Sequence, residues 1–251
     1  MKWTKIKTLM LCFLLVMNLF MLTILAMKTL RNEAIPQRVV NATLSVLKKS
    51  GFEISEEDFP DSYYTRNSYK AQFYSASDLS ELFFGKQLPF RTVDNYLVAS
   101  DDGATLIVDS NNFHYETEEQ NATKKTSSAV LKHTLKKKGF DMEGAVYDKE
   151  KNCFYKMYND SNLFNMSLEA KIDTNGEICY VKAQWPKTLI SGEKKKISFL
   201  DSTMKLRSAF PNGGKIQNIE LGYSLHQIGE NKFQFIPAWR VMVNDELRIL
   251  E

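Results

Sequence analysis

Histidines are the first residues to consider, because they are common metal ligands and proton-transfer groups. The chain has three: His114, His133 and His226. None belongs to an HExxH sequence or lies beside a second type of ligand, as a zinc site requires. We therefore expect structural or surface roles for all three histidines, and no bound metal.

Paired carboxylates are the next candidates for chemistry. The pairs lie in polar segments typical of loops: Glu56-Glu57, Asp101-Asp102 and Glu118-Glu119. A glycosidase needs two carboxylates in one cleft, and nothing in the sequence brings these pairs together. GxSxG, Walker A and GxGxxG sequences do not occur either. The sequence therefore favours a protein that is not an enzyme and needs no cofactor.

The cysteines leave two interpretations open. Cys12 lies in an apolar segment, whereas Cys153 and Cys179 lie on two expected strands. They could form a disulfide if that part of the chain is extracytoplasmic. They could equally be two small buried thiols.

An apolar segment at residues 9–27 is the strongest signal in the sequence. It reads "LMLCFLLVMNLFMLTILAM", and only Asn18 and Thr23 interrupt it. As a helix it would span about 28 Å, close to the thickness of a bilayer core. A cleaved signal peptide is the alternative, but "ILAMKTL" offers no clear cleavage site. We expect an uncleaved transmembrane helix over 9–27, with a cytoplasmic tail at 1–8.

Asn18 is unusual inside such a segment. A lone asparagine facing lipid is costly, and its amide can bond to a neighbouring helix. It could contact the membrane segment of a partner, or it could be tolerated within a single helix.

The charge distribution argues against nucleic acid as a partner. The net charge is +3, but Lys2, Lys5, Lys7 and Lys28 all precede the first acidic residue, Glu33. The remainder of the chain is close to neutral, whereas nucleic-acid binding needs a basic surface. Positive charges flank the apolar segment almost equally. The short tail favours an N-terminus inside the cell and residues after about 28 outside it.

Beyond a linker at 28–35, helical and extended segments alternate. Pro36 suits a helix start and Gly51 a helix end, and "LKKSGFEI" (47–54) is echoed by "LKKKGFDM" (135–142). This echo suggests two related halves, which we place at 36–120 and 121–251. Strands are expected at these segments: "SYKAQFYSAS", "NYLVAS", "ATLIVDS", "NCFYKMY", "FNMSLEAKID" and "EICYVKAQW". The second half is expected to begin with a helix near 121–138.

The chain is expected to close with a helix and two strands. Ser198 and Asp201 suit a helix start, and the strands read "IELGYSL" and "FQFIPAWRVMV". Pro237 belongs on an edge strand or at a bulge, because it cannot donate a ladder hydrogen bond. Trp239 falls on the apolar face, and Arg240 on the opposite one, exposed or paired. The whole indicates an α+β fold: one transmembrane helix and two helix-plus-antiparallel-sheet modules.

Both ends of the sequence resemble those of the YycI family. The N-terminus "MKWTKIKTLMLCFLLVMNLFM" has the family's Met-x-Trp-Ser/Thr-Lys/Arg-x-Lys-Thr opening and an asparagine within the helix, at Asn18. The C-terminal match is carried by these residues: Leu221, Gly222, Tyr223, Pro237, Ala238, Trp239 and Arg240. This C-terminal motif is shared with PepSY-like sheet domains, so the last module resembles those as well.

The resemblance implies a membrane-anchored regulatory protein of Gram-positive bacteria. Such proteins act with a similar partner, YycH, on the sensor histidine kinase of the essential WalK/WalR (YycG/YycF) two-component system, which controls cell-wall metabolism. Their contacts include the transmembrane helices, and they have no catalytic activity. Two other interpretations remain: a PepSY-like anchored inhibitor or chaperone of an exported hydrolase, and a wall-active enzyme.

Overall fold

The protein is described from a computed structural model that covers residues 3–30, 34–118 and 126–251. Its contacts divide the chain into two compact units. The first comprises residues 1–65 and 196–213, and the second comprises residues 66–195 and 214–251. Parts of three expected segments lie outside the described residues: positions 1–2 of the tail, 31–33 of the linker and 121–125 of the expected helix.

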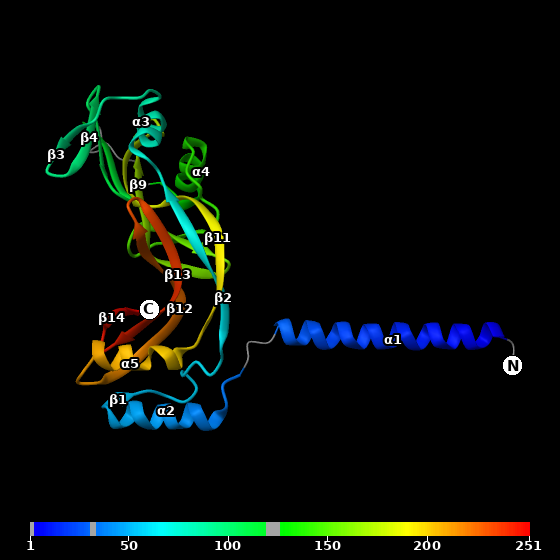
Figure 1. Ribbon diagram of the computed structural model, residues 1–251. Coiled ribbons are helices and arrows are strands. Elements are labelled where there is room, and N and C mark those ends of the chain that lie inside the picture. Colours follow the sequence, from blue (N-terminus) through cyan, green and yellow to red (C-terminus); the bar gives the residue numbers. More distant parts are fainter. Residues whose placement is uncertain (1–2, 31–33, 119–125) are drawn as a thin grey trace. The chain divides into compact units, whose positions relative to one another are not determined.

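The first unit contains α1 (Trp3–Leu30), a helix of 28 residues drawn in blue in Figure 1. It includes the whole apolar segment 9–27, so the expectation of a helix there is confirmed. The large apolar side chains described between Met10 and Leu22 are all exposed. Within the described part of the chain, no helix combines the length and the apolar composition that a membrane crossing requires.

The rest of the first unit is a small helical assembly. It contains α2 (Gln37–Lys49), β1 (Phe52–Glu53) and α5 (Phe199–Ala209). The predicted apolar stripe of α2 is confirmed, because Val40, Leu44 and Leu47 are buried. Helix α2 contacts α5, and the ring of Phe59 packs edge-on against Phe199 at 5.5 Å between centroids. Gly51 has φ +85°, the left-handed conformation that a helix end favours.

The second unit is built on a large mixed sheet. Its order is β11-β2-β13-β12-β9-β10-β6-β5-β4-β3, with β14 beside β13 and with β8 and then β7 beyond β9. Strands β12 and β9 run parallel. The bounds are β2 (Tyr64–Phe73), β3 (Arg91–Val93), β4 (Tyr96–Asp101), β5 (Ala104–Asp109), β6 (Asn112–Thr117), β7 (Ala145–Asp148), β8 (Cys153–Tyr158), β9 (Ser161–Ile172), β10 (Ile178–Gln184), β11 (Pro186–Ile197), β12 (Gly214–Gly229), β13 (Lys232–Val243) and β14 (Glu246–Leu250).

Two helices of the second unit cover one face of this sheet. Helix α3 (Ala76–Phe84) and helix α4 (Ser128–Lys138) contribute buried side chains to a core with β5, β6, β9 and β10. Leu79 and Phe83 come from α3, and Leu131 and Leu135 come from α4. Alternate residues of β5 point into this core, while Thr105, Ile107 and Asp109 remain half-exposed on the other face. One face of the sheet is therefore packed and the other is open.

A second core of this unit lies where β2, β9, β12 and β13 meet. Its buried members are Tyr69, Ala71, Leu163, Met166, Tyr223, Phe233 and Phe235. The apolar side predicted for the last long strand is confirmed, because Trp239, Val241 and Val243 are buried. The α+β class is likewise confirmed, whereas the division at 36–120 and 121–251 stays a prediction.

Some elements differ from the expectation. The segment "SYKAQFYSAS" was expected as one strand, but β2 ends at Phe73 because Ser75 and Asp78 form a capping box that starts α3. A further strand, β14, follows the two that were expected to close the chain. The echo of residues 47–54 at 135–142 holds for the helix end and a buried phenylalanine, Phe52 or Phe140. A strand begins at Phe52, whereas the strand after Phe140 begins only at Ala145.

Candidate functional site

The C-terminal motif forms one cross-strand block in β12 and β13. Its two halves lie opposite each other in the register: Leu221 faces Trp239, Gly222 faces Ala238 and Tyr223 faces Pro237. The sequence identified both halves but could not show that they pair residue by residue. Because Tyr223, Ala238 and Trp239 are buried, this block is part of the core and not an exposed binding surface.

Arg240 lies on the opposite side of β13 from Trp239, as expected, and it is paired. Its Nε donates to Oε2 of Glu220 at 3.1 Å, and Glu220 is its register partner on β12. Nη2 of Arg240 and Nδ2 of Asn162 also donate to the Glu220 carboxylate. The guanidinium lies 4.7 Å from the ring centroid of Phe164. Arg240 therefore ties β13 to both β12 and β9.

Pro237 lies inside the sheet, but at a point where β13 pairs with a strand, β12, along one edge only. Residues 233–235 of β13 pair with β2, and residues 239–243 pair with β14. Pro237 falls between these two ladders and faces Tyr223 of β12. The missing N–H therefore costs no ladder hydrogen bond on that side. The expectation of an edge position is met locally, although β13 as a whole is an interior strand.

Tyr223 belongs to a cluster of buried tyrosines in the second unit. Its ring packs edge-on against Tyr69 at 5.2 Å, and Tyr69 packs against Tyr158 at 4.5 Å. Burial raises the pKa of Tyr223 well above its ordinary value, and a hydrogen bond with Tyr69 raises it further. The phenol is therefore held neutral and serves packing, not proton transfer.

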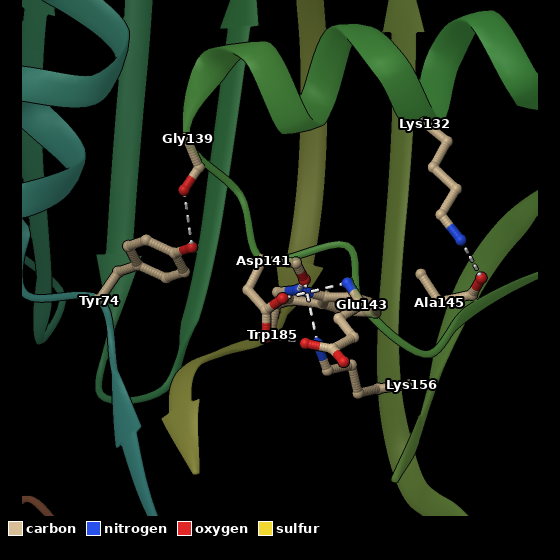
Figure 2. Close-up of polar contacts among 8 residues, drawn as sticks. All are labelled: Tyr74, Lys132, Gly139, Asp141, Glu143, Ala145, Lys156 and Trp185. Atoms are coloured by element: carbon tan, nitrogen blue, oxygen red, sulfur yellow. Dashed lines mark hydrogen bonds and ion pairs between the residues drawn. The ribbon is translucent and has the colours of Figure 1, made fainter. Parts of the chain in front are cut away.

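A buried lysine organises the segment that follows α4. Lys156 on β8 is only 2% exposed, and its Nζ donates to Asp141 Oδ2 at 2.7 Å and to Asp141 O at 3.0 Å. Trp185 Nε1 donates to the same carbonyl at 2.8 Å, as Figure 2 shows. Desolvation lowers the pKa of Lys156, and the hydrogen bond that its ammonium donates to the Asp141 carboxylate partly offsets this.

The same segment, residues 139–145, is held at both of its ends by side-chain hydrogen bonds. Tyr74 OH donates to Gly139 O at 3.3 Å, and Lys132 Nζ donates to Ala145 O at 2.8 Å (Figure 2). These contacts give the main-chain carbonyls of Gly139 and Ala145 side-chain donors. Lys156 is thus structural, which its position in the sequence does not reveal, because a lysine in a strand is usually exposed.

The open face of the sheet carries a hollow of about 450 Å³. Its lining comes from β4, β5, β6, β8, β9, β10 and the turn before β8, and it combines apolar surface with polar and charged side chains. A second hollow of about 350 Å³ shares Lys151, Cys153 and Ser167 with the first and extends to Arg240. Sequence reasoning missed this concavity, because its residues come from separate strands that only the register brings together.

Of the carboxylates first considered for chemistry, Asp101, Asp102 and Glu118 lie around one hollow of about 380 Å³. His114 Nε2 lies 3.4 Å from Glu116 Oε2, and His226 Nε2 lies 2.8 Å from Glu251 Oε2. No cluster of potential metal ligands occurs among the described residues. Cys153 is half-buried, Cys179 is buried, and no disulfide joins them, as the interpretation of two thiols requires.

Asn18 lies on α1 with its side chain exposed among apolar neighbours. Thr23, the other polar residue of the segment, donates to Phe20 O at 2.7 Å within the helix. The helix thus presents an exposed amide on an otherwise apolar surface.

The sequence matches the family model described as YycI protein over residues 33–249. A search of curated proteins gives no match. Among solved structures, the chain resembles an uncharacterized protein from Eubacterium rectale ATCC 33656, with a TM-score of 0.41 and 9% identity over 76% of this chain and 83% of that one. It also resembles YycH from Bacillus subtilis, with a TM-score of 0.43 and 12% identity over 77% of this chain and 53% of the other. The chain therefore spans about half the length of that YycH chain.

Proposed function

The chain belongs to the YycI family, a regulatory family and not an enzyme family, and from this premise we propose that it regulates a sensor histidine kinase of the WalK (YycG) type. It does so from the outer side of the cell membrane, together with a YycH-like partner. The kinase controls cell-wall metabolism. The observation that carries this proposal is the family match over residues 33–249.

The proposed anchor is the apolar segment 9–27 of α1. Exposed apolar side chains from Met10 to Leu22 support this role, because such a surface is unfavourable in water and needs lipid or another helix to cover it. The N-terminal tail lies in the cytoplasm, and the residues after about 28 lie outside the membrane.

Asn18 is the proposed contact with a partner helix. Its exposed amide can donate and accept hydrogen bonds with a neighbouring transmembrane helix, where a partner removes the cost of an unpaired amide in lipid. The C-terminal motif has a different role. Its paired residues hold β12 and β13 together and so keep the extracytoplasmic part folded.

Regulation requires that the chain bind two states of the kinase with different affinity. A partner that binds both states equally shifts no equilibrium, however tightly it binds. Contacts in the membrane meet this requirement where the two states of the kinase differ in the arrangement of its transmembrane helices.

The test is co-purification from native membranes of the full-length chain and of a copy whose residues 9–27 are replaced by a generic apolar helix. We expect the kinase to co-purify with the native chain and to be lost with the replaced anchor. Recovery of an exported hydrolase with both forms, without any kinase, would instead support the PepSY-like inhibitor or chaperone. Equal membrane content of both forms, checked by fractionation, is the control.

A further inference from the structure

The open face of the sheet in the second unit carries two rows of side chains that run across the strands. In the first row, Asp109 faces Asn112, Asn112 faces Gln184, and Gln184 faces Ser167. All four residues line the hollow of about 450 Å³. The row therefore presents carboxylate, amide and hydroxyl groups side by side along one wall of a concave surface.

The second row lies beside the first and is charged. Ile107 faces His114, His114 faces Lys182, and Lys182 faces Glu169, so the row crosses β5, β6, β10 and β9. Together the two rows supply both hydrogen-bond donors and acceptors over the same surface.

The formal charges of the lining cancel. Asp109 and Glu169 supply two negative charges, and Lys151 and Lys182 supply two positive ones. A polyanion such as a nucleic acid or a polyphosphate backbone needs an excess of cations to bind. The balance therefore favours a neutral ligand that both donates and accepts hydrogen bonds.

The main chain beneath the hollow is not free to bind a peptide as an added strand. Strand β6 pairs with β5 on one side and with β10 on the other, and β10 pairs in turn with β9. Strand addition requires the unpaired N–H and C=O groups of a sheet edge. The hollow must therefore recognise its ligand through side chains.

An aromatic side chain stands at one end of the lining. Tyr96 on β4 is 45% exposed and lines the hollow. An exposed tyrosine ring offers an apolar face and a polar hydroxyl. The face can pack against the C–H groups of a sugar ring while the amides and carboxylates bind its hydroxyls.

The second hollow lengthens this surface. It continues from the shared residues Lys151, Cys153 and Ser167 toward Arg240 and Asn165. Asn165 is an exposed residue of β9 with φ +65°. It is one of the four residues between Asn162 and Ser167, where the register between β9 and β8 is interrupted. Irregularities of this kind re-aim side chains and are frequent beside binding sites. The two hollows, of about 450 Å³ and about 350 Å³, together suit several linked units better than one.

We propose that these two hollows form a binding groove for a neutral oligosaccharide. The amides of Asn112 and Gln184 bind sugar hydroxyls, and Tyr96 packs against a sugar ring. This inference does not depend on the proposed kinase regulation, because it concerns the open sheet face and not the apolar helix.

The test is calorimetric titration of the full-length chain in lipid nanodiscs made without sugar-based detergent. The probes are tetramers of β-1,4-linked glucose, β-1,4-linked N-acetylglucosamine and α-1,4-linked glucose, at concentrations up to about 10 mM, which covers weak affinities. We expect saturable binding of at least one probe. The double substitution Asn112→Ala and Gln184→Ala should weaken it at least about tenfold, because both amides lose their hydrogen bonds to sugar.

Two matched comparisons separate recognition from folding. Gln87→Ala removes an exposed amide outside the groove and should leave the affinity unchanged. Tyr96→Ala should weaken binding, whereas Tyr96→Phe should keep most of it because the ring face remains. The melting temperature of every variant should stay close to that of the parent.

Three outcomes would overturn the proposal. They are no saturable binding of any of the three tetramers, binding that the groove substitutions leave unchanged, and binding of a poly(glycerol phosphate) in place of the neutral probes. Failure of kinase co-purification would not bear on it, so the two proposals can fail separately.

Discussion

Gly222 of β12 and Phe164 of β9 lie so close that a methyl group at position 222 would overlap the Phe164 ring. The same methyl group would also come within 2.6 Å of the main-chain oxygen of Asn162. A glycine is needed here for close approach between strands, not for a special backbone conformation. The close approach of Phe164 and Asn162 thus explains why the C-terminal motif has a glycine at position 222.

Gly222→Ala should therefore lower the free energy of unfolding by about 1–3 kcal/mol, the usual cost of overpacking. Chemical denaturation measures this. Gly229→Ala is the matched control, because it lies at the end of the same strand and its new methyl group would meet only ordinary contacts at 3.6 Å or more. Equal effects of the two substitutions would contradict the packing argument.

Trp239→Ala should destabilise the second unit strongly. The side chain is only 2% exposed, and removing a buried tryptophan leaves a large cavity, at a cost of about 3–5 kcal/mol. The thermal unfolding of the full-length chain measures the loss. An unshifted melting curve would show that Trp239 is not part of the core.

Tyr223 should make stability depend on alkaline pH. Its pKa is raised in the folded chain by burial and by the hydrogen bond with Tyr69, above the ordinary value of 10.0. As the pH rises, the unfolded chain therefore loses the phenol proton of Tyr223 at a lower pH than the folded chain does. The stability that the neutral phenol provides is fully present below pH 10.0 and is lost as the pH rises toward the folded-state pKa.

Tyr223→Phe should remove this part of the dependence. The loss of unfolding free energy between about pH 8 and about pH 11 should be smaller in the variant than in the parent chain. Denaturant titrations at both pH values measure it. The prediction is contradicted if both proteins lose the same amount, since the other tyrosines with raised pKa values are unchanged in the variant.

Lys156→Met should leave stability unchanged or increase it slightly. The buried ammonium is costly to desolvate, as its lowered pKa indicates, and a buried ion pair can often be replaced by an apolar group of similar volume. Asp141 is 43% exposed and would stay hydrated, and its carbonyl would keep the hydrogen bond from Trp185.

Lys156→Ala tests how much the buried aliphatic stem of the lysine contributes to stability. It removes the buried stem as well as the charge, so it should cost about 2–5 kcal/mol through the cavity that it leaves. Urea denaturation of the two variants side by side is the measurement. A large loss in Lys156→Met would mean that the ion pair with Asp141 contributes net stability.

Asn18→Leu should weaken association with the kinase in the membrane and leave the rest of the chain folded. The substitution removes the exposed amide of α1 and makes the helix surface more uniformly apolar. Co-purification from native membranes measures it, and Thr23→Leu is the control because that hydroxyl is already bonded to Phe20 O. Undiminished recovery of the kinase with Asn18→Leu would sink the proposed contact.

Local sequence patterns predicted the elements that depend on local chemistry. The apolar stripe of Val40, Leu44 and Leu47 predicted α2. The alternation of apolar and polar residues along β13 predicted that Trp239 lies in the core. The start of α3 was also visible in principle, because Ser75 and Asp78 have the spacing of a capping box. The expectation of one strand over "SYKAQFYSAS" overlooks that signal.

The features that depend on strand register could not be predicted. The groove needs Asn112, Gln184 and Ser167 to fall in line across three strands, which only the pairing of β6, β10 and β9 achieves. Lys156 reads as an outward strand position, yet it is buried beside Trp185. Pro237 is tolerated inside the sheet because it lies between the part of β13 that pairs with β2 and the part that pairs with β14. No local sequence pattern encodes this gap between the two ladders.

The central claim is that the chain shifts the activity of the kinase through the membrane. The most direct measurement is the autophosphorylation rate of the purified full-length kinase in lipid vesicles, with the native chain, with the anchor-replaced chain, and with neither. We expect the native chain to change the rate and the anchor-replaced chain, at equal membrane density, to leave it unchanged. A rate that is the same in all three vesicle preparations would contradict it.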